Sequence, residues 1–250
     1  MKIVTWNCNG ALRKKTDVID TLKPDIAVVQ ECENPDESTA KYKAWAGEYL
    51  WFGRSKNKGI GIFAKNGNTV RKLEWSGEFR IDGLVSRHAS LSWKTEELEL
   101  FFPCRINDEL NLLAVWTKAA NSNNFGYMGQ FWKYLQIHRL ELSLSPTMIV
   151  GDFNSNTRWD QPDRWWNHSD VIDELREIGI TSLYHEQFSE DQGKETSPTF
   201  YLHRKEDKPY HIDYVFLSED LKAISKLTVG KRNDWISVSD HMPLIVETKY

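Results

Sequence analysis

The stretch Met148–Asn154 reads MIVGDFN, an apolar run that stops at a carboxylate and an amide. Four further motifs resemble it and are spread from one terminus to the other: MKIVTWN at 1–7, IAVVQE at 26–31, HIDY at 211–214 and SDH at 239–241. Each places polar side chains where a β-strand is expected to end. A sheet that gathers those ends would bring together a set of residues able to hold a hard cation and carry out acid/base chemistry: Asn7, Glu31, Asp152, Asn154, Asp213, Asp240 and His241.

The composition limits the kind of protein this can be. The chain has 250 residues, of which 40% are hydrophobic and 27% charged, enough for one large core. We expect a single domain over residues 1–250. No stretch approaches the roughly 18 apolar residues that cross a bilayer, and the sequence begins with a strand rather than a targeting segment. These features predict a cytoplasmic protein that does not associate with membranes.

Three cysteines, Cys8, Cys32 and Cys104, have neither the number nor the spacing of a disulfide framework or a zinc site. Cys8 and Cys32 directly follow Asn7 and Glu31, so alternation along a strand points them away from the polar set and into packing. Reduced, packed thiols are typical of a cytosolic protein.

The formal net charge of −4 removes any argument from global basicity, so nucleic-acid binding would need a local positive field. The sequence has four basic clusters in predicted loops, and these loops are either solvated surface or sites of phosphate contact. Phosphate contact requires the loops to lie at the same end of the strands as the polar motifs. The basic clusters are Arg13–Lys15, Arg54–Lys58, His203–Lys208 and Lys231–Arg232.

Strand-like runs outnumber helical ones, and the chain has no repeat and no linker. The predicted helices are Lys14–Leu22, Asp36–Ala46, Phe125–Leu144 and His168–Ile178. The predicted strands are Ile3–Trp6, Ile26–Gln30, Tyr49–Phe52, Gly59–Ala64, Leu84–Trp93, Leu98–Pro103, Leu110–Trp116, Thr147–Val150, Ile212–Leu217, Ala223–Val229 and Pro243–Thr248. This pattern favours two packed sheets flanked by helices over a doubly wound parallel sheet, which needs a helix between nearly every pair of strands.

The GDFN motif is the most specific of the five. Asp152 can act as a general base or as an acid to a leaving group, while Asn154 lies on the same side and can hold a water or a phosphate oxygen. Asp and Asn after glycine are also common turn residues, so both interpretations stand. Glu31 is either a metal ligand or a solvated or ion-paired strand end, and Asn7 either orients a ligand or forms a turn.

Asp213 and His241 fit together as a pair. A carboxylate bonded to one imidazole nitrogen favours the protonated ring, which can engage a phosphate or a developing oxyanion. Asp240 is then free to bind a metal, whereas a purely structural His241 is the alternative. The sequence has no G-x-S-x-G elbow, no G-x-x-x-x-G-K-[ST] loop and no H-E-x-x-H pair, which argues against the corresponding hydrolases.

The ordered set resembles the endonuclease/exonuclease/phosphatase superfamily over Lys2 to His241. The residues that carry the resemblance are Trp6-Asn7, Gln30-Glu31, Gly151-Asp152-Phe153-Asn154, Ile212-Asp213-Tyr214 and Ser239-Asp240-His241. It implies an α/β fold, a four-layer sandwich in which two mixed β-sheets pack face to face and are flanked by helices. It also implies Mg²⁺ as cofactor, with Mn²⁺ as the alternative, nucleic acid and DNA in particular as partner, and no obligate protein partner.

For the metal, the resemblance implies Glu31 as the principal ligand, with Asp240 and Asn7 completing the environment directly or through water. The abasic-site enzymes of the superfamily commonly carry Asp two residues after the first Asn. This sequence has Asn9 there, so we expect a less acidic metal site.

For the reaction, the resemblance implies that Asp152 activates the attacking water or protonates the leaving oxygen, positioned by Asn154. His241, oriented by Asp213, would stabilise the phosphorane-like transition state. The implied mechanism is a single in-line displacement at phosphorus without a covalent enzyme intermediate.

For the substrate, Trp116 stands where the family usually has His or Tyr, and an indole cannot transfer a proton. It either faces the substrate as a stacking surface or packs in the core. Phe200 and Tyr210 lie near positions that line the sugar pocket of the abasic-site endonucleases, so they are candidate substrate-binding residues. The clustered tryptophans could stack on bases or cover a sheet edge: Trp159, Trp165 and Trp166.

The sequence therefore predicts a metal-dependent phosphodiesterase that hydrolyses nucleic acid, DNA foremost, in the manner of exonuclease III or an abasic-site endonuclease. The alternative within the same fold is a phosphoesterase for a small molecule, nucleotide, inositol phosphate or lipid headgroup. A third hypothesis is a binding module that retains the fold, and the suitable residue types at the catalytic positions argue against it.

Overall fold

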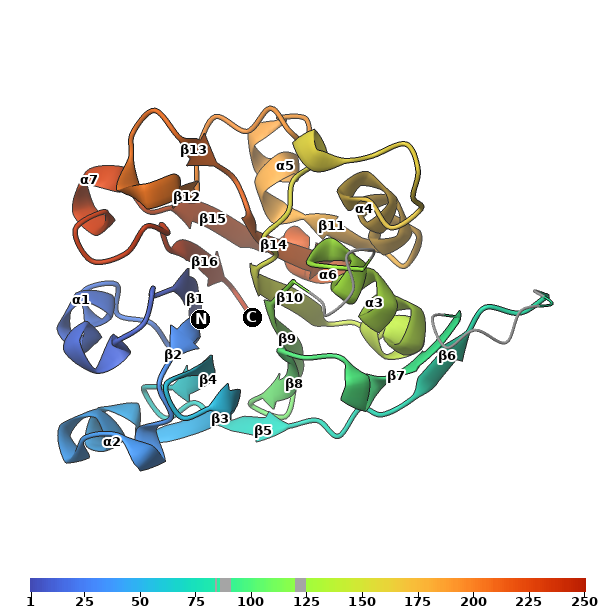
Figure 1. Ribbon diagram of the computed structural model, residues 1–250. Coiled ribbons are helices and arrows are strands. Elements are labelled where there is room, and N and C mark those ends of the chain that lie inside the picture. The colour runs from blue at the N-terminus through green and yellow to red at the C-terminus, as the bar shows by residue number, and fades with distance from the viewer. Residues whose placement is uncertain (84, 86–90, 120–124) are drawn as a thin grey trace.

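Two six-stranded β-sheets form the centre of the protein in the computed structural model, which describes residues 1–83, 85, 91–119 and 125–250 (Figure 1). One sheet consists of β1 (Lys2–Asn7), β2 (Ile26–Cys32), β3 (Glu48–Ser55), β4 (Lys58–Ala64), β15 (Ser225–Val229) and β16 (Leu244–Thr248). The other consists of β5 (Val70–Lys72), β8 (Phe101–Ile106), β9 (Leu110–Trp116), β10 (Thr147–Asp152), β11 (Ile180–Ser182) and β14 (Asp213–Ser218). Two small hairpins pair β6 (Glu78–Arg80) with β7 (Ser92–Lys94) and β12 (Phe200–Tyr201) with β13 (Pro209–Tyr210).

Both sheets are mixed. The strand orders are β15-β16-β1-β2-β4-β3 in the first sheet and β11-β14-β10-β9-β8-β5 in the second. In each sheet one central pair is parallel, β1 with β2 and β9 with β10, and the other pairs are antiparallel. The parallel pairs need helical crossovers, which α1 (Thr16–Asp20) and α3 (Met128–Leu142) provide.

The core between the sheets comes from alternation along the central strands. Ile3 of β1 and Ile26 and Val28 of β2 belong to one buried cluster with Ala114 of β9 and Val150 of β10. Successive side chains of a strand face opposite sides of the sheet. The central strands are therefore apolar on both faces, as a sheet covered on both sides requires.

Helices cover the two outer faces. On the first sheet, Ile19 of α1, Tyr42 of α2 (Ala40–Ala46) and Trp235 of α7 (Arg232–Trp235) belong to one buried cluster with strand residues. On the second sheet, α3 and α4 (His168–Glu177) contribute Phe131 and Leu175 to another. The short helices α5 (Leu183–Phe188) and α6 (Glu219–Lys222) lie against β14 and β15. The predicted fold class, a four-layer α/β sandwich, is confirmed.

The polar motifs gather at one rim because of this topology. The carboxyl ends of β1, β2, β9 and β10 lie there, together with the amino ends of their antiparallel neighbours β14 and β16. Asp152, the last residue of β10, lies directly opposite Asp213, the first residue of β14. A hydrogen bond from Asn7 of β1 to Asp152 joins the rims of the two sheets.

Several predicted boundaries differ from the structure. The helix predicted over Phe125–Leu144 is α3, which is shorter at both ends. The strand predicted over Leu98–Pro103 is displaced to β8, because the chain first makes a 3₁₀ turn over 95–97 and a left-handed turn at Leu100. Short elements such as β5, β6, β11 and α5 were missed, since three to six residues show little periodicity. Most of the strand predicted over Leu84–Trp93 lies outside the described residues.

A buried histidine at the start of α4 should make the fold sensitive to acid. His168 is 1% exposed, and burial lowers its pKa to about 3 from the ordinary 6.5. The unfolded chain therefore binds a proton that the folded protein does not, and stability is lost as the pH falls from 6.5 towards 3. Between pH 7 and pH 4.5 the unfolding free energy of the wild type should therefore fall by about 2 kcal/mol more than that of His168→Asn. Urea denaturation at both pH values measures this loss.

The matched control for this experiment is His203→Asn, because His203 is exposed on the surface. It should leave the pH dependence as in the wild type. An equal loss of stability in His168→Asn and the wild type would contradict a neutral, buried His168.

Candidate active site

One hollow at the rim collects the polar strand-end residues. It has a volume of about 380 Å³, and six of the seven residues predicted from the motifs line it: Asn7, Glu31, Asp152, Asn154, Asp240 and His241. The seventh, Asp213, is hydrogen-bonded to the imidazole of His241. The other residues of the wall are Asn9, Trp116, Thr117, Lys118, Ala119, Tyr127 and Phe200. The structure thus brings together all seven residues.

Glu31 is positioned by an irregularity in β2. The register with β4 shifts between Gln30 and Cys32, so Glu31 lies in a β-bulge. Its φ of 64° is in the left-handed region, which costs a residue with a Cβ about 1–3 kcal/mol. The carboxylate forms an ion pair with Lys58. Bulges of this kind re-aim a side chain, and here the side chain lines the hollow.

The Asn7 amide links carboxylates of the two sheets. Its Nδ2 donates to Asp152 Oδ2 at 2.9 Å and to Glu31 Oε1 at 3.4 Å. Its Oδ1 accepts a hydrogen bond from the backbone N–H of Asn9 at 3.0 Å. The backbone carbonyl of Asn7 accepts a hydrogen bond from Ser239 Oγ at 2.8 Å, which ties β1 to the SDH motif. These bonds fix the orientation of the amide.

The GDFN segment turns sharply after β10. Gly151 has φ 141°, and a Cβ at this position would lie 1.9 Å from the carbonyl oxygen of Val115, so the close approach of β9 requires glycine. Asp152 Oδ1 accepts a hydrogen bond from the backbone N–H of Asn154 at 2.9 Å. The Asn154 side chain donates to the carbonyl of Thr117 at 3.2 Å. The turn therefore holds both polar side chains at the end of the strand.

His241 lies between two buried carboxylates. Its Nδ1 is 2.9 Å from Asp213 Oδ2, and its Nε2 is 4.0 Å from Asp152 Oδ2. Burial alone lowers the pKa of His241, but the two carboxylates raise it to about 9, so the ring is protonated at neutral pH. Burial and the charge of Asp213 raise the pKa of Asp152 to about 7. The cluster thus pairs a cation with a carboxyl group that can exchange a proton near neutral pH.

The hollow suits a hard divalent cation. Glu31, Asp240 and Asn7 line it, and carboxylate and amide oxygens are the ligands that Mg²⁺ and Mn²⁺ prefer. Among the described residues, one group of three has ligand atoms within 4.8 Å of one another: Asp152, Asp213 and His241. A protonated imidazole donates hydrogen bonds and cannot ligate a metal. We therefore interpret that group as a charge-sharing cluster beside the candidate metal position.

Trp116 packs in the core between the sheets and is 3% exposed. Lys118 Nζ lies 3.3 Å from the centroid of its ring. An ammonium group over an indole face is a favourable cation–π contact, and it covers the face on which a base would stack. The geometry favours the packed-core interpretation of Trp116. Where the ring lines the hollow, it holds the ammonium group of Lys118 there.

A larger cleft of about 570 Å³ adjoins the hollow and shares Asn154 and Phe200 with it. The Phe200 ring lies 4.6 Å from the His241 ring. Tyr210 stacks on Trp159 with ring centroids 5.5 Å apart. Both candidate substrate residues, Phe200 and Tyr210, thus line a cleft beside the polar hollow. Trp166 also lines it, whereas the exposed Trp165 does not appear among the lining residues.

From the sequence, Lys58 was named only as part of the basic cluster Arg54–Lys58, and two further residues that the structure places at the site, Lys118 and Thr199, were not singled out. Lys58 pairs with Glu31, and Lys118 lines the hollow. Thr199 Oγ1 accepts hydrogen bonds from the backbone N–H groups of Ile212 and Asp213, both at 3.0 Å. For Lys118, its position just after the strand end at Trp116 was the available signal. The basic cluster Arg13–Lys15, by contrast, is engaged in structural contacts with Glu33 and the Cys8 carbonyl.

The three cysteines are free and buried, and Cys8 and Cys32 pack in the cluster on the outer face of the first sheet. Strand alternation accounts for the position of Cys8, whereas the bulge at Glu31 places Cys32 on the outer face. Burial raises the pKa of the Cys8 thiol to about 12, so it is unreactive at neutral pH.

Comparison with protein-family models shows which family the chain belongs to. Residues 4–241 match the endonuclease/exonuclease/phosphatase family, and the chain therefore belongs to it. The family name covers enzymes that cleave phosphate esters, which makes this chain a hydrolase of that class. A comparison with curated proteins finds no match.

Solved structures share the fold over the full chain. The Neisseria 3′ phosphatase NExo, bound to a product DNA hairpin, has 18% identity, complete coverage of both chains and a TM-score of 0.70. An AP endonuclease from Archaeoglobus fulgidus has 16% identity, the same coverage and a TM-score of 0.65. The catalytic domain of Xenopus laevis APE2 has 17% identity and a TM-score of 0.64, with 100% of this chain and 92% of that one covered.

The family match confirms the resemblance that the motifs indicated, and the solved structures confirm the fold. Across the described part of the chain, no helix combines the length and apolarity needed to traverse a membrane. The role of each site residue and the cellular location stay predictions.

The charge arrangement around His241 can be measured directly. In the metal-free protein its ring should titrate near pH 9, and Asp213→Asn should lower the pKa of His241 by at least about 1 unit, because the nearer carboxylate is removed. Histidine-selective NMR titration in EDTA measures both values. Titration of His241 near pH 6.5 in the wild type, or at the same pH in both proteins, would contradict the arrangement.

Proposed function

We propose that the protein is a divalent-metal-dependent phosphodiesterase that hydrolyses nucleic acid, with DNA as the leading substrate. The observation that carries the proposal is the hollow itself, because Glu31, Asp240 and Asn7 line it together with the imidazolium of His241 and the carboxyl group of Asp152. A cation site next to an imidazolium suits a phosphate group, because both attract its oxygens.

Glu31, Asp240 and Asn7 are the residues proposed to hold Mg²⁺, or Mn²⁺ as the alternative. The bound cation would neutralise charge on the phosphate group. Glu31 is the principal candidate because its bulge holds a carboxylate at the wall of the hollow. Asn7 supports this role by bridging Glu31 and Asp152.

Asp152 is proposed to take a proton from the attacking water or to protonate the leaving oxygen. Its pKa of about 7 makes both protonation states accessible at neutral pH, as general acid/base catalysis requires. Asn154 is proposed to position the reacting water or a phosphate oxygen. His241 would stabilise the negative charge of the transition state, with Asp213 holding the ring protonated and oriented.

Local charge and the adjoining cleft support a nucleic-acid substrate. Lys58 and Lys118 place positive charge at the hollow although the chain as a whole is acidic. Phe200, Tyr210 and Trp159 offer aromatic faces against which a sugar or a base can pack. The structural neighbours include a 3′ phosphatase bound to a DNA hairpin and an AP endonuclease, which supports DNA.

A small phosphoester is the second candidate. The observation in its favour is the cleft itself, since about 570 Å³ is within the range that encloses a ligand of nucleotide size. The same catalytic residues would serve either substrate, so the two candidates differ in what the cleft and its rim bind.

The proposal is tested with purified protein, Mg²⁺ and labelled substrates: duplex, single-stranded and abasic-site DNA, RNA and a small phosphodiester. We expect DNA cleavage that EDTA abolishes. Glu31→Gln should lower kcat/KM at least about 100-fold, because an amide oxygen replaces the principal anionic ligand. Glu37→Gln is the matched control, since Glu37 is an exposed glutamate on the segment that follows Glu31 and should retain wild-type activity.

Two outcomes separate the parts of the proposal. Cleavage confined to the small phosphodiester would overturn the nucleic-acid substrate and leave the site assignment standing. Equal rates for the wild type and Glu31→Gln on every substrate, whether high or absent, would overturn the metal-dependent mechanism.

A further inference from the structure

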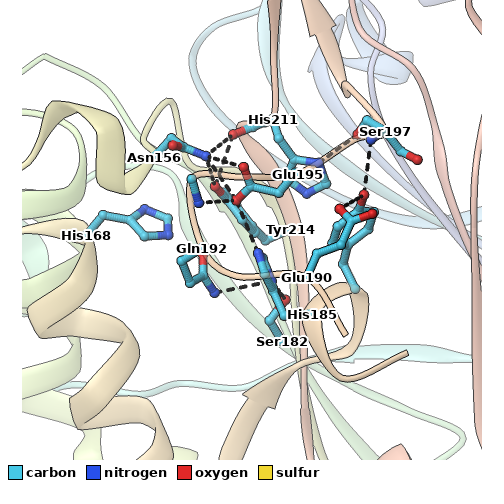
Figure 2. Close-up of polar contacts among 12 residues, drawn as sticks. Asn156, His168, Ser182, His185, Glu190, Gln192, Glu195, Ser197, His211 and Tyr214 are labelled. Atoms are coloured by element: carbon cyan, nitrogen blue, oxygen red, sulfur yellow. Dashed lines mark hydrogen bonds and ion pairs between the residues drawn. The ribbon is translucent and has the colours of Figure 1, made fainter. Parts of the chain in front are cut away.

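Figure 2 shows a second cluster of buried and half-buried polar side chains, which the proposed chemistry does not use. It connects the loop after α5 with the segment that follows Asp152 and the segment that contains Asp213. Its members include Asn156, His168, Ser182, His185, Gln192, Glu195, His211 and Tyr214.

Glu195 is the charged centre of the cluster, and its side chain is only 3% exposed. Burial alone raises its pKa, but hydrogen bonds from His185 and from the backbone N–H of Gly193 lower it to about 2. The carboxylate is therefore ionised at any pH near neutrality. In the described part of the chain the basic side chain nearest to this carboxylate is His185, with Nε2 3.1 Å from Oε1.

All hydrogen bonds between the described residues and this carboxylate are donated to it. Asn156 Nδ2 lies 3.1 Å from both oxygens, and the N–H of Gly193 donates to Oε1 at 2.9 Å. His185 Nδ1 lies 3.2 Å from the Gln192 amide nitrogen, which can only donate, so the ring proton is on Nε2 and points to Glu195. A glutamine in place of Glu195 would turn an NH₂ group towards at least one of these donors.

Asn156 connects this charge to the catalytic segments. The same Nδ2 lies 3.1 Å from the carbonyl oxygen of His211 and 3.1 Å from the hydroxyl of Tyr214. The Tyr214 hydroxyl in turn lies 3.2 Å from the carbonyl oxygen of Ser155. The segment 153–156, which begins after Asp152, is therefore bonded to the segment 211–214, which contains Asp213.

We propose that Glu195 is a positioning residue for the catalytic carboxylates. Its buried charge orients the Asn156 amide, which, together with Tyr214, holds the chain after Asp152 against the chain around Asp213. The kinetic part of this inference rests on the proposed phosphodiesterase function. The geometric part concerns only the placement of segments 153–156 and 211–214.

The positioning role explains the cluster better than a bound metal ion does. Within the described residues, the only three side chains of the metal-binding types with ligand atoms within 4.8 Å of one another are those of Asp152, Asp213 and His241. Burial lowers the pKa of His168 to about 3 and also lowers that of His211, so neither of these two rings adds a positive charge beside Glu195. The charge of the Glu195 carboxylate is therefore stabilised by its hydrogen-bond donors, and the carboxylate in turn fixes the orientation of those donors.

The test compares Glu195→Gln with Glu190→Gln. Glu190 is a carboxylate of the same loop, but its hydrogen bonds among the described residues are with Thr196 and Tyr184 rather than with Asn156. In Glu195→Gln we expect kcat on DNA to fall at least about tenfold while KM stays within about threefold, because the reacting groups are displaced and the binding surface is kept. The NMR signals of the Asn154 side-chain amide and the Asp213 backbone amide should shift. Glu190→Gln should change neither readout.

Three outcomes would overturn the inference. The first is a folded Glu195→Gln protein with wild-type kcat and unshifted Asn154 and Asp213 signals. The second is reduced thermal stability with unchanged kcat, which would make Glu195 merely structural. If Glu195→Gln does not fold, Tyr214→Phe takes its place, because it removes one hydroxyl of the network. Unchanged kcat and unshifted signals in Tyr214→Phe are then the third overturning outcome. A smaller fall in kcat with shifted signals supports the inference.

The NMR readout also separates this inference from the proposed function. If the wild type hydrolyses none of the substrates, the proposed function fails. Shifted Asn154 and Asp213 signals in Glu195→Gln alone would still support the positioning role, and unshifted signals would overturn it.

Discussion

The site depends on the contact of one imidazolium with two buried carboxylates. Asp152 and Asp213 lie opposite each other at the ends of neighbouring antiparallel strands, where two negative charges removed from water repel each other. His241 comes from the segment before β16 of the other sheet and lies between them. Its positive charge offsets the repulsion and is itself stabilised by both carboxylates, as the raised pKa of His241 shows. One interaction therefore joins the two halves of the sandwich where the motifs meet, and leaves a carboxyl group that can exchange a proton near neutral pH.

The remaining features of the site place other groups around this contact. The parallel pairs β1–β2 and β9–β10 fix the Cα positions at the rim, and local departures from regular backbone then aim the side chains. The bulge at Glu31 and the left-handed turn at Asn154 are two such departures, with φ of 64° and 47°. Strained backbone persists only where its surroundings hold it, and hydrogen bonds from the Asn7 and Asn154 side chains do so here. The Glu195 cluster adds hydrogen bonds that connect segments 153–156 and 211–214.

Much of the fold and the membership of the site could be predicted from the sequence, because the hydrophobic runs show where the central strands end. The convergence of Asn7, Glu31, Asp152 and His241 follows from that pattern once the strands form two facing sheets. The bulge at Glu31 leaves no signal in the sequence, and Lys118 resembles any lysine of a solvated loop. Glu195 lies in a polar, loop-rich segment, and its burial arises only from tertiary packing. The indole of Trp116 was ambiguous for the same reason, since the contact with Lys118 that covers its face depends on the folded chain.

The central claim is that the gathered strand ends form one metal and phosphate site. Anomalous diffraction from crystals soaked with Mn²⁺ locates a bound ion without reference to activity or substrate. The account predicts an anomalous peak in the hollow within coordination distance of a Glu31 carboxylate oxygen, about 2.0–2.6 Å, with Asp240 or Asn7 contributing directly or through water. A peak elsewhere with none at Glu31, or no peak in the hollow at saturating Mn²⁺, would contradict it.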